Sequence, residues 1–261
     1  MSFFISFISF NNNILSIKFN RPERYNAVNQ DVIDCLNECF DEIEKNEKVR
    51  SIVITGNGKG FCSGADMSVF SENVTAEQRK DHLIKYYQPL INRFTSLNKP
   101  IIGAVNGTAA GVGAALALAC DLRVMGERSA ILYAFINIGL GPDGGASWLL
   151  ARQVGYSKAL EIAISGKKIM ANDCLKLGLT NRVVSDDKIL NEAINWAHEL
   201  SKKPTLAIGI TKADMIHSLD NDLNATIAFE AVKQIDAFKS YDLKEGVSAF
   251  IEKRPAKFKG K

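Results

Sequence analysis

The stretch Asn106-Gly-Thr-Ala-Ala-Gly-Val-Gly113 joins a predicted strand, Ile101–Val105, to the apolar segment Gly113–Cys120. That segment is rich in Ala and Leu and has no polar face, a pattern typical of a helix buried on all sides. A strand, a glycine-rich turn and a buried helix in this order favour parallel strand pairing through crossover connections. The stretch therefore indicates an α/β fold.

Other segments agree with this class. Further strands are predicted at Ile14–Phe19, Ser51–Thr55, Leu122–Met125 and, with a weaker pattern, Arg182–Val184. Apolar residues from Val32 to Ile43 follow one helix face, and Asn29 precedes them as a possible N-cap. The first ten residues lack a basic region and a small-residue cleavage site, so they predict a first strand that turns at 11–13 rather than a signal peptide.

Composition excludes several classes of protein. The 261 residues are 46% apolar and 23% charged, which suits one large domain or a core with an appendage. A net charge of +3 is too small to indicate a nucleic-acid partner, and no run approaches the roughly 18 apolar residues of a membrane span. Five cysteines without CxxC spacing predict neither disulfides nor a metal site, so we expect a cytoplasmic protein.

The last third of the chain has a different pattern. Strand signals stop at about Asp187, and Leu190–Ser201 and Ala207–Phe238 have helical periodicity. A final periodic segment, Gly246–Lys253, ends in a basic tail. We therefore predict an α/β core over residues 1–186 and a helical region over residues 187–261.

Two glycine-rich turns are candidates for binding negative charge. Gly56–Gly64 follows a predicted strand and leads into Ala65 and Asp66, and the second turn, Asn106–Gly113, leads into the buried helix. The spacing of the second turn fits neither GxGxxG nor a P-loop, so a nucleotide site is not indicated. Backbone N–H groups at such turns could converge on one oxygen, whereas the alternative is close packing that merely requires small residues.

Asp143 is the candidate base. It lies in Gly141-Pro-Asp-Gly-Gly145, where a lone carboxylate could move a proton, or could cap a helix that starts near Ala146. Asp66 has a similar alternative as an N-cap. Two sets of amide donors and one base are what proton transfer next to a carbonyl requires. His82, His198 and His217 have no suitable partners in the sequence and are predicted to lie on the surface.

Five motifs together resemble the crotonase, or enoyl-CoA hydratase/isomerase, superfamily over nearly the whole chain. In chain order they are Asn20–Asn29, Gly60–Asp66, Ala104–Gly113, Leu175–Val183 and Glu245–Arg254. The resemblance implies a spiral of ββα units that binds acyl-CoA, followed by a helical region that trimerises the chain and covers the active site. It implies a homotrimer or a dimer of trimers, and acyl-CoA thioester substrates in which coenzyme A is part of the substrate rather than a separate cofactor.

The resemblance also implies roles for individual residues. The enolate oxygen would be held by the backbone amides of Ala65 and Val112. Residues that fall on the coenzyme A path are Arg24, Ala27, Ser63 and Asp66, and those that fall where a neighbouring subunit reaches the nucleotide are Phe250 and Lys253.

Departures from the hydratase pattern narrow the reaction. The two glutamates of the family's hydratases would fall at Ala115 and at about Phe135, neither of which can activate water. Asp143 instead falls at the acid/base position of a branch that resembles enoyl-CoA isomerases and the phenylacetate-pathway epoxide isomerase. This implies an isomerase that shifts a double bond through an enolate with one aspartate. An apolar lining by Phe135, Ile136 and Leu140 would raise the pKa of that aspartate.

Other reactions stay open at this point. They are hydration with atypical residues, an aryl-CoA dehalogenase-like reaction, and a non-catalytic role in binding coenzyme A. Acyl chain length, a ring or linear substrate, and fatty-acid or aromatic-acid catabolism depend on pocket volume. The pocket is expected to be set by the loop-like region Met67–Tyr87 and the carboxyl-terminal helices.

Overall fold

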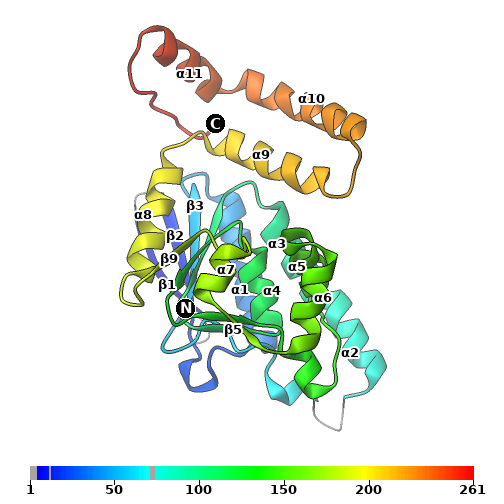
Figure 1. Cartoon of the computed structure of the whole chain (residues 1–261). Coiled ribbons are helices and arrows are strands. Elements are labelled where there is room, and N and C mark those ends of the chain that lie inside the picture. The colour runs from blue at the N-terminus through cyan, green and yellow to red at the C-terminus, as the bar shows by residue number, and fades with distance from the viewer. Residues whose placement is uncertain (1–4, 12, 71–73) are drawn as a thin grey trace.

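A computed structural model describes residues 5–11, 13–70 and 74–261, and it confirms the mixed α/β class (Figure 1). Within this part of the chain, six strands form one sheet in the order β1-β2-β3-β4-β6-β9. Its strands are β1 (Ile5–Asn11), β2 (Ile14–Phe19), β3 (Ser51–Gly56), β4 (Ile101–Val105), β6 (Leu122–Gly126) and β9 (Arg182–Val184). In this sheet the strands β2, β3, β4, β6 and β9 are parallel to one another. The edge strand β1 pairs antiparallel with β2. All six predicted strands are present where the chain is described; residues 1–4 of the predicted first strand and Asn12 of the predicted turn lie outside the described residues.

The two faces of the sheet are both covered, as Figure 1 shows. Alternate residues of a strand point to opposite faces, so Ile52 and Ile54 of β3 join the larger core while Val53 joins the smaller one. The larger core is covered by helices α1 (Gln30–Lys45), α3 (Gln88–Ser96) and α4 (Val112–Ala119), and the smaller one by α8 (Ile189–Ser201). Because both faces are buried, most residues of the strands are apolar.

Asn29 caps α1 as predicted, because its Oδ1 accepts a hydrogen bond from the Val32 amide at 3.1 Å. Every residue of α4 is buried, which confirms the prediction from its apolar sequence. The remaining helices of the core are α5 (Ala146–Val154), α6 (Tyr156–Ser165) and α7 (Ala171–Lys176).

A second, three-stranded sheet was not predicted. It contains β5 (Thr108–Ala110), β7 (Ala130–Leu132) and β8 (Lys168–Met170). Strands of three residues are too short for alternation to be visible in a sequence. The sheet matters because β5 lies inside the second glycine-rich turn and fixes its course.

The carboxyl end of α4 is held by a buried arginine. Arg123 donates hydrogen bonds to the carbonyl oxygens of Cys120 at 2.6 Å and Leu179 at 2.6 Å, and to Gln153 Oε1 at 3.0 Å. It also approaches the Ala117 and Leu118 carbonyls at 3.4 and 3.3 Å. Carbonyls at a helix end have no partner within the helix, so this cation both satisfies them and complements the helix dipole.

Helices alone follow β9 in the described chain. After α8 come α9 (Thr205–Ser218), α10 (Leu223–Lys239) and α11 (Tyr241–Ile251). α8 packs on the sheet, whereas α10 and α11 lie beyond α9, at the end of the molecule farthest from the sheet's lower edge in Figure 1. The segment expected to be helical from Ala207 to Phe238 is two helices, because Asp222 caps a new one by accepting from the Ala225 amide at 2.9 Å.

The region Met67–Tyr87 is helical where described, so its interpretation as loop-like was wrong. A 3₁₀ turn, η2 (Met67–Phe70), is followed by α2 (Ala76–His82) and a π-helical turn, η3 (Leu83–Tyr87). α2 starts with a capping box: Thr75 Oγ1 accepts from the Gln78 amide at 3.2 Å, and Gln78 Oε1 accepts from the Thr75 amide at 2.9 Å. The Thr-x-x-Gln spacing was a usable signal for this helix.

Candidate active site

The two glycine-rich turns lie against each other. Cys62 and Ala109 form a parallel bridge, and the Ala110 amide donates to the Cys62 carbonyl at 2.9 Å. Gly64 has φ +104°, and a Cβ atom there would lie 2.9 Å from the Ala110 carbonyl oxygen. Only glycine fits this approach without strain. The turns therefore form one rigid unit rather than two independent loops.

The unit presents two backbone amides without partners. Within the described chain, no hydrogen bond joins the Ala65 or Val112 N–H to another residue. Val112 is the first residue of α4, where amide groups point away from the helix and the dipole favours negative charge. Gly64 and Gly111, which precede the two donors, are close enough that a Cβ on Gly111 would lie 3.9 Å from Gly64 Cα. The arrangement is suited to holding an oxygen atom that gains negative charge.

The turn that carries Asp143 packs against the start of α4. Gly144 has φ +58°, and a Cβ atom there would lie 3.0 Å from Val112 Cγ2. α5 begins at Ala146 as expected, but its N-cap is Gly145 and no side chain caps it. The Ala146 amide donates to the backbone carbonyl of Asp143 at 3.1 Å. The interpretation of the Asp143 carboxylate as a helix cap was therefore wrong.

The Asp143 carboxylate is held by Arg79 of α2. Arg79 Nη2 donates to Asp143 Oδ2 at 2.9 Å, and both side chains are less than one-fifth exposed. No hydrogen bond from the described residues reaches Oδ1. Burial raises the pKa of Asp143 above its ordinary value, and the Arg79 guanidinium opposes this rise. The Asp143 carboxylate is thus fixed through one of its two oxygens.

Tyr87 completes this side of the site. Its ring is buried, and the Arg79 guanidinium carbon lies 5.8 Å from the ring centroid. A Cβ atom on Gly144 would lie 3.8 Å from Tyr87 Cδ1, so the ring also contacts the Asp143 turn. Burial raises the pKa of Tyr87 well above its usual range. Sequence reasoning found neither role: Tyr87 was expected only in the region that sets pocket volume, and Arg79 was not singled out.

The three residues expected to line the site differ in burial. Phe135 is buried, and a Cβ atom added to Gly111 would lie 3.9 Å from its ring. Ile136 and Leu140 are exposed in the single chain. Ala115 is fully buried inside α4.

Four predicted coenzyme A contacts lie together. The Ser63 hydroxyl donates to the Arg24 carbonyl at 3.2 Å, and the Ser63 amide donates to the Tyr25 carbonyl at 2.9 Å. Val28, next to Ala27, forms a parallel bridge with Ala65. The Arg24 side chain is exposed and makes no ion pair with a described residue. A free cation therefore stands next to the amide-presenting turn.

Asp66 has a structural role that the sequence predicted in part. Its Oδ1 accepts from the Ser68 amide at 3.1 Å, which caps the short turn η2. Its Oδ2 pairs with Arg21 Nη2 at 2.9 Å, and Arg21 also donates to the Ala27 carbonyl at 2.7 Å. The hydrogen bond from Ser68, followed by those from Arg21, lowers the pKa of Asp66. The Asp66 carboxylate therefore stays ionised and links Arg21 to the turn η2.

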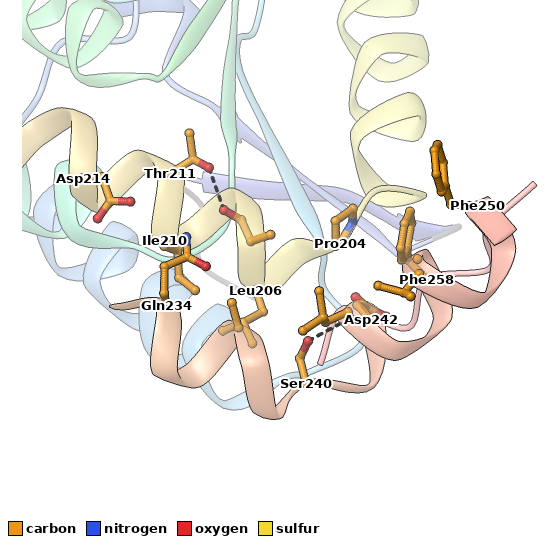
Figure 2. Close-up of a pocket in the computed structure, with 15 residues that line it drawn as sticks. Pro204, Leu206, Ile210, Thr211, Asp214, Gln234, Ser240, Asp242, Phe250 and Phe258 are labelled. Carbon is orange, nitrogen blue, oxygen red and sulfur yellow. Dashed lines mark hydrogen bonds between the residues drawn. The ribbon is translucent and has the colours of Figure 1, made fainter. Parts of the chain in front are cut away.

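Phe250 and Lys253 are not brought to the other site residues within one chain. They lie at the end of α11, in the outer helical arm of Figure 1, and Phe250 is 86% exposed. Figure 2 shows Phe250 near Phe258 at one end of a pocket of about 480 Å³ between α9, α10 and α11. Their predicted contact with a nucleotide depends on a neighbouring subunit.

The three histidines, predicted to be surface residues rather than catalysts, are partly exposed. His82 Nε2 lies 3.1 Å from Gln30 Oε1, and its ring packs between two tyrosines. His217 stacks on Phe229 with ring centroids 4.0 Å apart. These ring contacts account for the partial burial of His82 and His217.

Comparison with known proteins gives a consistent result. The profile of the family described as enoyl-CoA hydratase/isomerase matches residues 9–261. The chain is 35% identical to the 1,2-epoxyphenylacetyl-CoA isomerase of Escherichia coli over the full length of both proteins. It is 37% identical to a probable enoyl-CoA hydratase of Rhodobacter capsulatus over 94% of each.

Solved structures agree with the sequence comparisons. The enoyl-CoA hydratase of Polaromonas sp. has a TM-score of 0.90 at 30% identity and covers 97% of this chain and 99% of its own. The enoyl-CoA hydratase of Bacillus anthracis has a TM-score of 0.92 at 26% identity, with coverage of 99% and 100%. In the part of this chain that the structure describes, no helix has the length and apolar character needed to cross a membrane.

Proposed function

Because the chain belongs to the enoyl-CoA hydratase/isomerase family, we propose that its own reaction is an acyl-CoA isomerisation in which Asp143 is the single acid/base. The observation that carries the proposal is the position of Asp143. Its turn packs on Val112, while the positions assigned to the hydratase glutamates hold the buried residues Ala115 and Phe135. The substrate class is an acyl-CoA thioester with a double bond or a strained ring next to the carbon that loses a proton.

The amide pair stabilises the charge that forms. When a proton leaves the carbon beside the thioester, the electron pair moves onto the thioester oxygen, which accepts hydrogen bonds from the Ala65 and Val112 amides. These donors are fixed before substrate arrives because the two turns are bridged through Cys62 and Ala109. One donor of this kind contributes about 3–4 kcal/mol to lowering a barrier.

Asp143 moves the proton. Its Oδ1 takes the proton from one carbon, breaking the C–H bond, and returns it to a second carbon on the same face while the double bond shifts. Arg79 holds Oδ2 during this sequence, so the free oxygen keeps its direction. Burial raises the pKa of Asp143 and makes it a stronger base than an exposed aspartate.

The remaining predictions belong to the same proposal. Arg24, Ala27, Ser63 and Asp66 would line the path of coenzyme A, and Phe250 and Lys253 would complete it from a neighbouring subunit. α10 has no buried residue, and its exposed apolar side chains support a homotrimer or a dimer of trimers. Division at residue 186, covering of the site by the helical region and a cytoplasmic location stay predictions.

The test is an isomerase assay with purified protein and trans-3-hexenoyl-CoA, following the ultraviolet absorbance of the conjugated 2-enoyl thioester. We expect Asp143→Asn to lower kcat at least 10³-fold. Asp220→Asn is the matched control, because Asp220 also pairs with an arginine, Arg152, but on the surface. Its activity should equal that of the wild type.

Two outcomes contradict the proposal. The first is turnover of the 3-enoyl substrate that survives Asp143→Asn. The second is hydration of trans-2-hexenoyl-CoA without any isomerisation, which would favour the hydratase activity in the name of the Rhodobacter capsulatus relative. If 3-hexenoyl-CoA is inert, the same variants are to be assayed with 1,2-epoxyphenylacetyl-CoA, the substrate in the name of the Escherichia coli relative.

A further inference from the structure

The residues after α11 run back along that helix. The chain reverses at Lys253, and in Figure 1 the tail then leads from the end of α11 toward the start of α9. Glu245 holds the first part of the tail, because its carboxylate accepts from Arg254 Nη1 at 2.6 Å and Nη2 at 3.1 Å. The same carboxylate accepts from the Lys257 amide at 2.7 Å. Residues 254–257 are therefore fixed against the middle of α11.

Asp242 holds the second part of the tail. It is 4% exposed, and its two carboxylate oxygens accept from the amides of Lys259 at 2.6 Å and Gly260 at 2.7 Å. Its own amide donates to the Lys261 carbonyl at 3.1 Å. Burying a carboxylate is unfavourable unless it accepts hydrogen bonds, and bonds to an ionised acceptor are among the stronger ones. The buried charge of Asp242 thus binds the tail to the start of α11.

Arg50 connects the same tail to the core. It precedes β3, and it donates from Nη1 to the Phe258 carbonyl at 3.0 Å and from Nε to Thr205 Oγ1 at 2.9 Å. Its Nη2 donates to the Lys203 carbonyl. Burial lowers the pKa of Arg50, and the nearby charge of Asp242 opposes this fall. One guanidinium therefore links the sheet, the start of α9 and the tail.

Gly260 shows how closely these parts fit. Its φ is +83°, and a Cβ atom there would lie 3.0 Å from both Arg50 Nε and Thr205 Oγ1. A residue with a side chain would be strained in this conformation and crowded by both neighbours. We refer to these parts together as the tail clasp, which consists of Arg50, Asp242, Glu245 and residues 254–260.

The position of α11 depends on the tail clasp. The buried residues of this helix are Asp242 and Ala249, whereas Phe250 and Ile251 are exposed. Helices in proteins gain most of their stability from packing an apolar face, and α11 buries little apolar surface in the single chain. The hydrogen bonds of the clasp provide the attachment that packing does not.

Lys253 lies at the turn that the clasp closes. Its φ is +53°, a left-handed conformation that residues with side chains rarely adopt and keep only where their surroundings impose it. The next residue, Arg254, is held by Glu245 and Glu252. Lys253 itself is exposed and makes no ion pair with a described residue. The turn therefore presents one ammonium group to solvent from a fixed backbone.

We propose that the tail clasp positions Lys253 to bind the nucleotide phosphates of an acyl-CoA held by the neighbouring subunit. Arg50, Asp242 and Gly260 then act on coenzyme A affinity without touching it. The inference rests on the proposed function, which assigns Lys253 to the coenzyme A of a neighbouring subunit. Phosphates suit this site because they are anionic and a lysine binds them as a point charge.

The test compares two ligands that differ in the nucleotide and need no turnover. Hexanoyl-CoA carries the nucleotide phosphates, whereas hexanoyl-pantetheine ends before them. Their dissociation constants are to be measured calorimetrically with the wild type, Lys253→Ala, Gly260→Ala and Asp242→Asn. Gly178→Ala is the control, because Gly178 also has a positive φ, +75°, but open space around it.

Lys253→Ala should weaken binding of hexanoyl-CoA about tenfold or more, the value of one hydrogen bond to a charged group. Gly260→Ala and Asp242→Asn should weaken it by a similar factor because both release the tail, whereas Gly178→Ala should bind as the wild type does. Affinity for hexanoyl-pantetheine should stay within twofold in every variant. Lys253→Ala combined with Gly260→Ala should bind no more weakly than Lys253→Ala alone, because both changes remove the same contact.

Several results overturn the inference. They are unchanged hexanoyl-CoA binding in Lys253→Ala, clasp variants that weaken both esters equally or neither, full additivity in the double variant, and wild-type protein that binds neither ester. Light scattering should give Gly260→Ala the mass of the wild type, since a smaller mass would mean that the clasp serves assembly instead. Turnover that persists in Asp143→Asn would refute the single-base mechanism and leave these affinities standing.

Discussion

Arg79 and Asp143 form an ion pair at 2.9 Å between residues 64 positions apart in the sequence. The pair connects α2 to the turn before α5, and it is less than one-fifth exposed. Burial and the guanidinium act on the carboxyl in opposite directions, burial raising its pKa and Arg79 lowering it. The pKa of Asp143 therefore reflects burial first, and Arg79, which lies outside the five sequence motifs, limits the rise.

Replacing Arg79 should shift the pH dependence of the reaction. Arg79→Met removes the group that lowers the Asp143 pKa and leaves burial, so the pKa rises and the carboxylate is lost at a higher pH. The acid limb of kcat/KM against pH should therefore move to higher pH. Arg152→Met, which breaks a surface pair with Asp220, should leave the profile in place. An unchanged acid limb in Arg79→Met would separate Asp143 from catalysis.

Adding one methyl group to Gly64 should displace the first amide donor. Gly64→Ala places a Cβ 2.9 Å from the Ala110 carbonyl oxygen at φ +104°, so the backbone before Ala65 has to move. We expect kcat/KM to fall about 10²-fold or more, as for loss of an oxyanion donor. Gly178→Ala also has a positive φ, +75°, but open space around it. It should lose about 1–2 kcal/mol of stability and keep its activity; equal activity of the two variants would argue against the Ala65 amide.

The two buried tyrosines should differ in their response to loss of their hydroxyls. Tyr133→Phe leaves the Ala146 carbonyl without its donor and should lower the free energy of unfolding by about 1 kcal/mol. The Tyr87 hydroxyl interacts with the flexible Arg79 side chain rather than with a backbone carbonyl, so Tyr87→Phe should lower the free energy of unfolding by less than Tyr133→Phe does. Urea denaturation measures both. Equal destabilisation of the two variants would contradict this difference.

Removing the cation at the end of α4 should be costly. Arg123→Met leaves the Cys120 and Leu179 carbonyls and Gln153 without their buried donor. We expect a loss of about 3–5 kcal/mol in the free energy of unfolding, as when one partner of a buried charged network is removed. Arg182→Met is the control, because Arg182 is only partly buried and pairs with Glu192 at 2.8 Å; its loss should be about 1 kcal/mol or less. Equal losses in the two variants would contradict the capping role of Arg123.

Sequence patterns predicted the features that depend on residues close together in the sequence. The strand Ile14–Phe19, the cap at Asn29 and the fully buried helix α4 each depend on a local spacing of residue types, and each is present. Asp143 was ambiguous because a carboxylate before a helix is a common cap. Its actual partner, Arg79, comes from a distant element, and no local pattern encodes such a contact.

Other features depended on signals that were weak or missing. α2 carried a capping box at Thr75 and Gln78, but the loop interpretation gave that signal no weight. β5, β7 and β8 are too short to show a period. The predicted role of Phe250 and Lys253 requires a second subunit, and no local pattern places residues of two subunits together. The geometry of the amide pair was foreseen only as a possibility, since glycine spacing does not specify which turns meet.

The bridge between Cys62 and Ala109 fixes the backbone part of the site independently of its side chains. In the proposed mechanism, the donors for the thioester oxygen belong to the backbone of two joined turns, so most side-chain replacements leave them unchanged. The proposed base Asp143, the Arg79 cation and the Tyr87 phenol are side chains on separate elements and can be exchanged one at a time. This allows a lineage, or an engineer, to change the acyl group and the reaction while enolate stabilisation is retained. Directed evolution toward new acyl-CoA substrates should therefore begin at Arg79 and Tyr87 and leave Gly64 and Gly111 untouched.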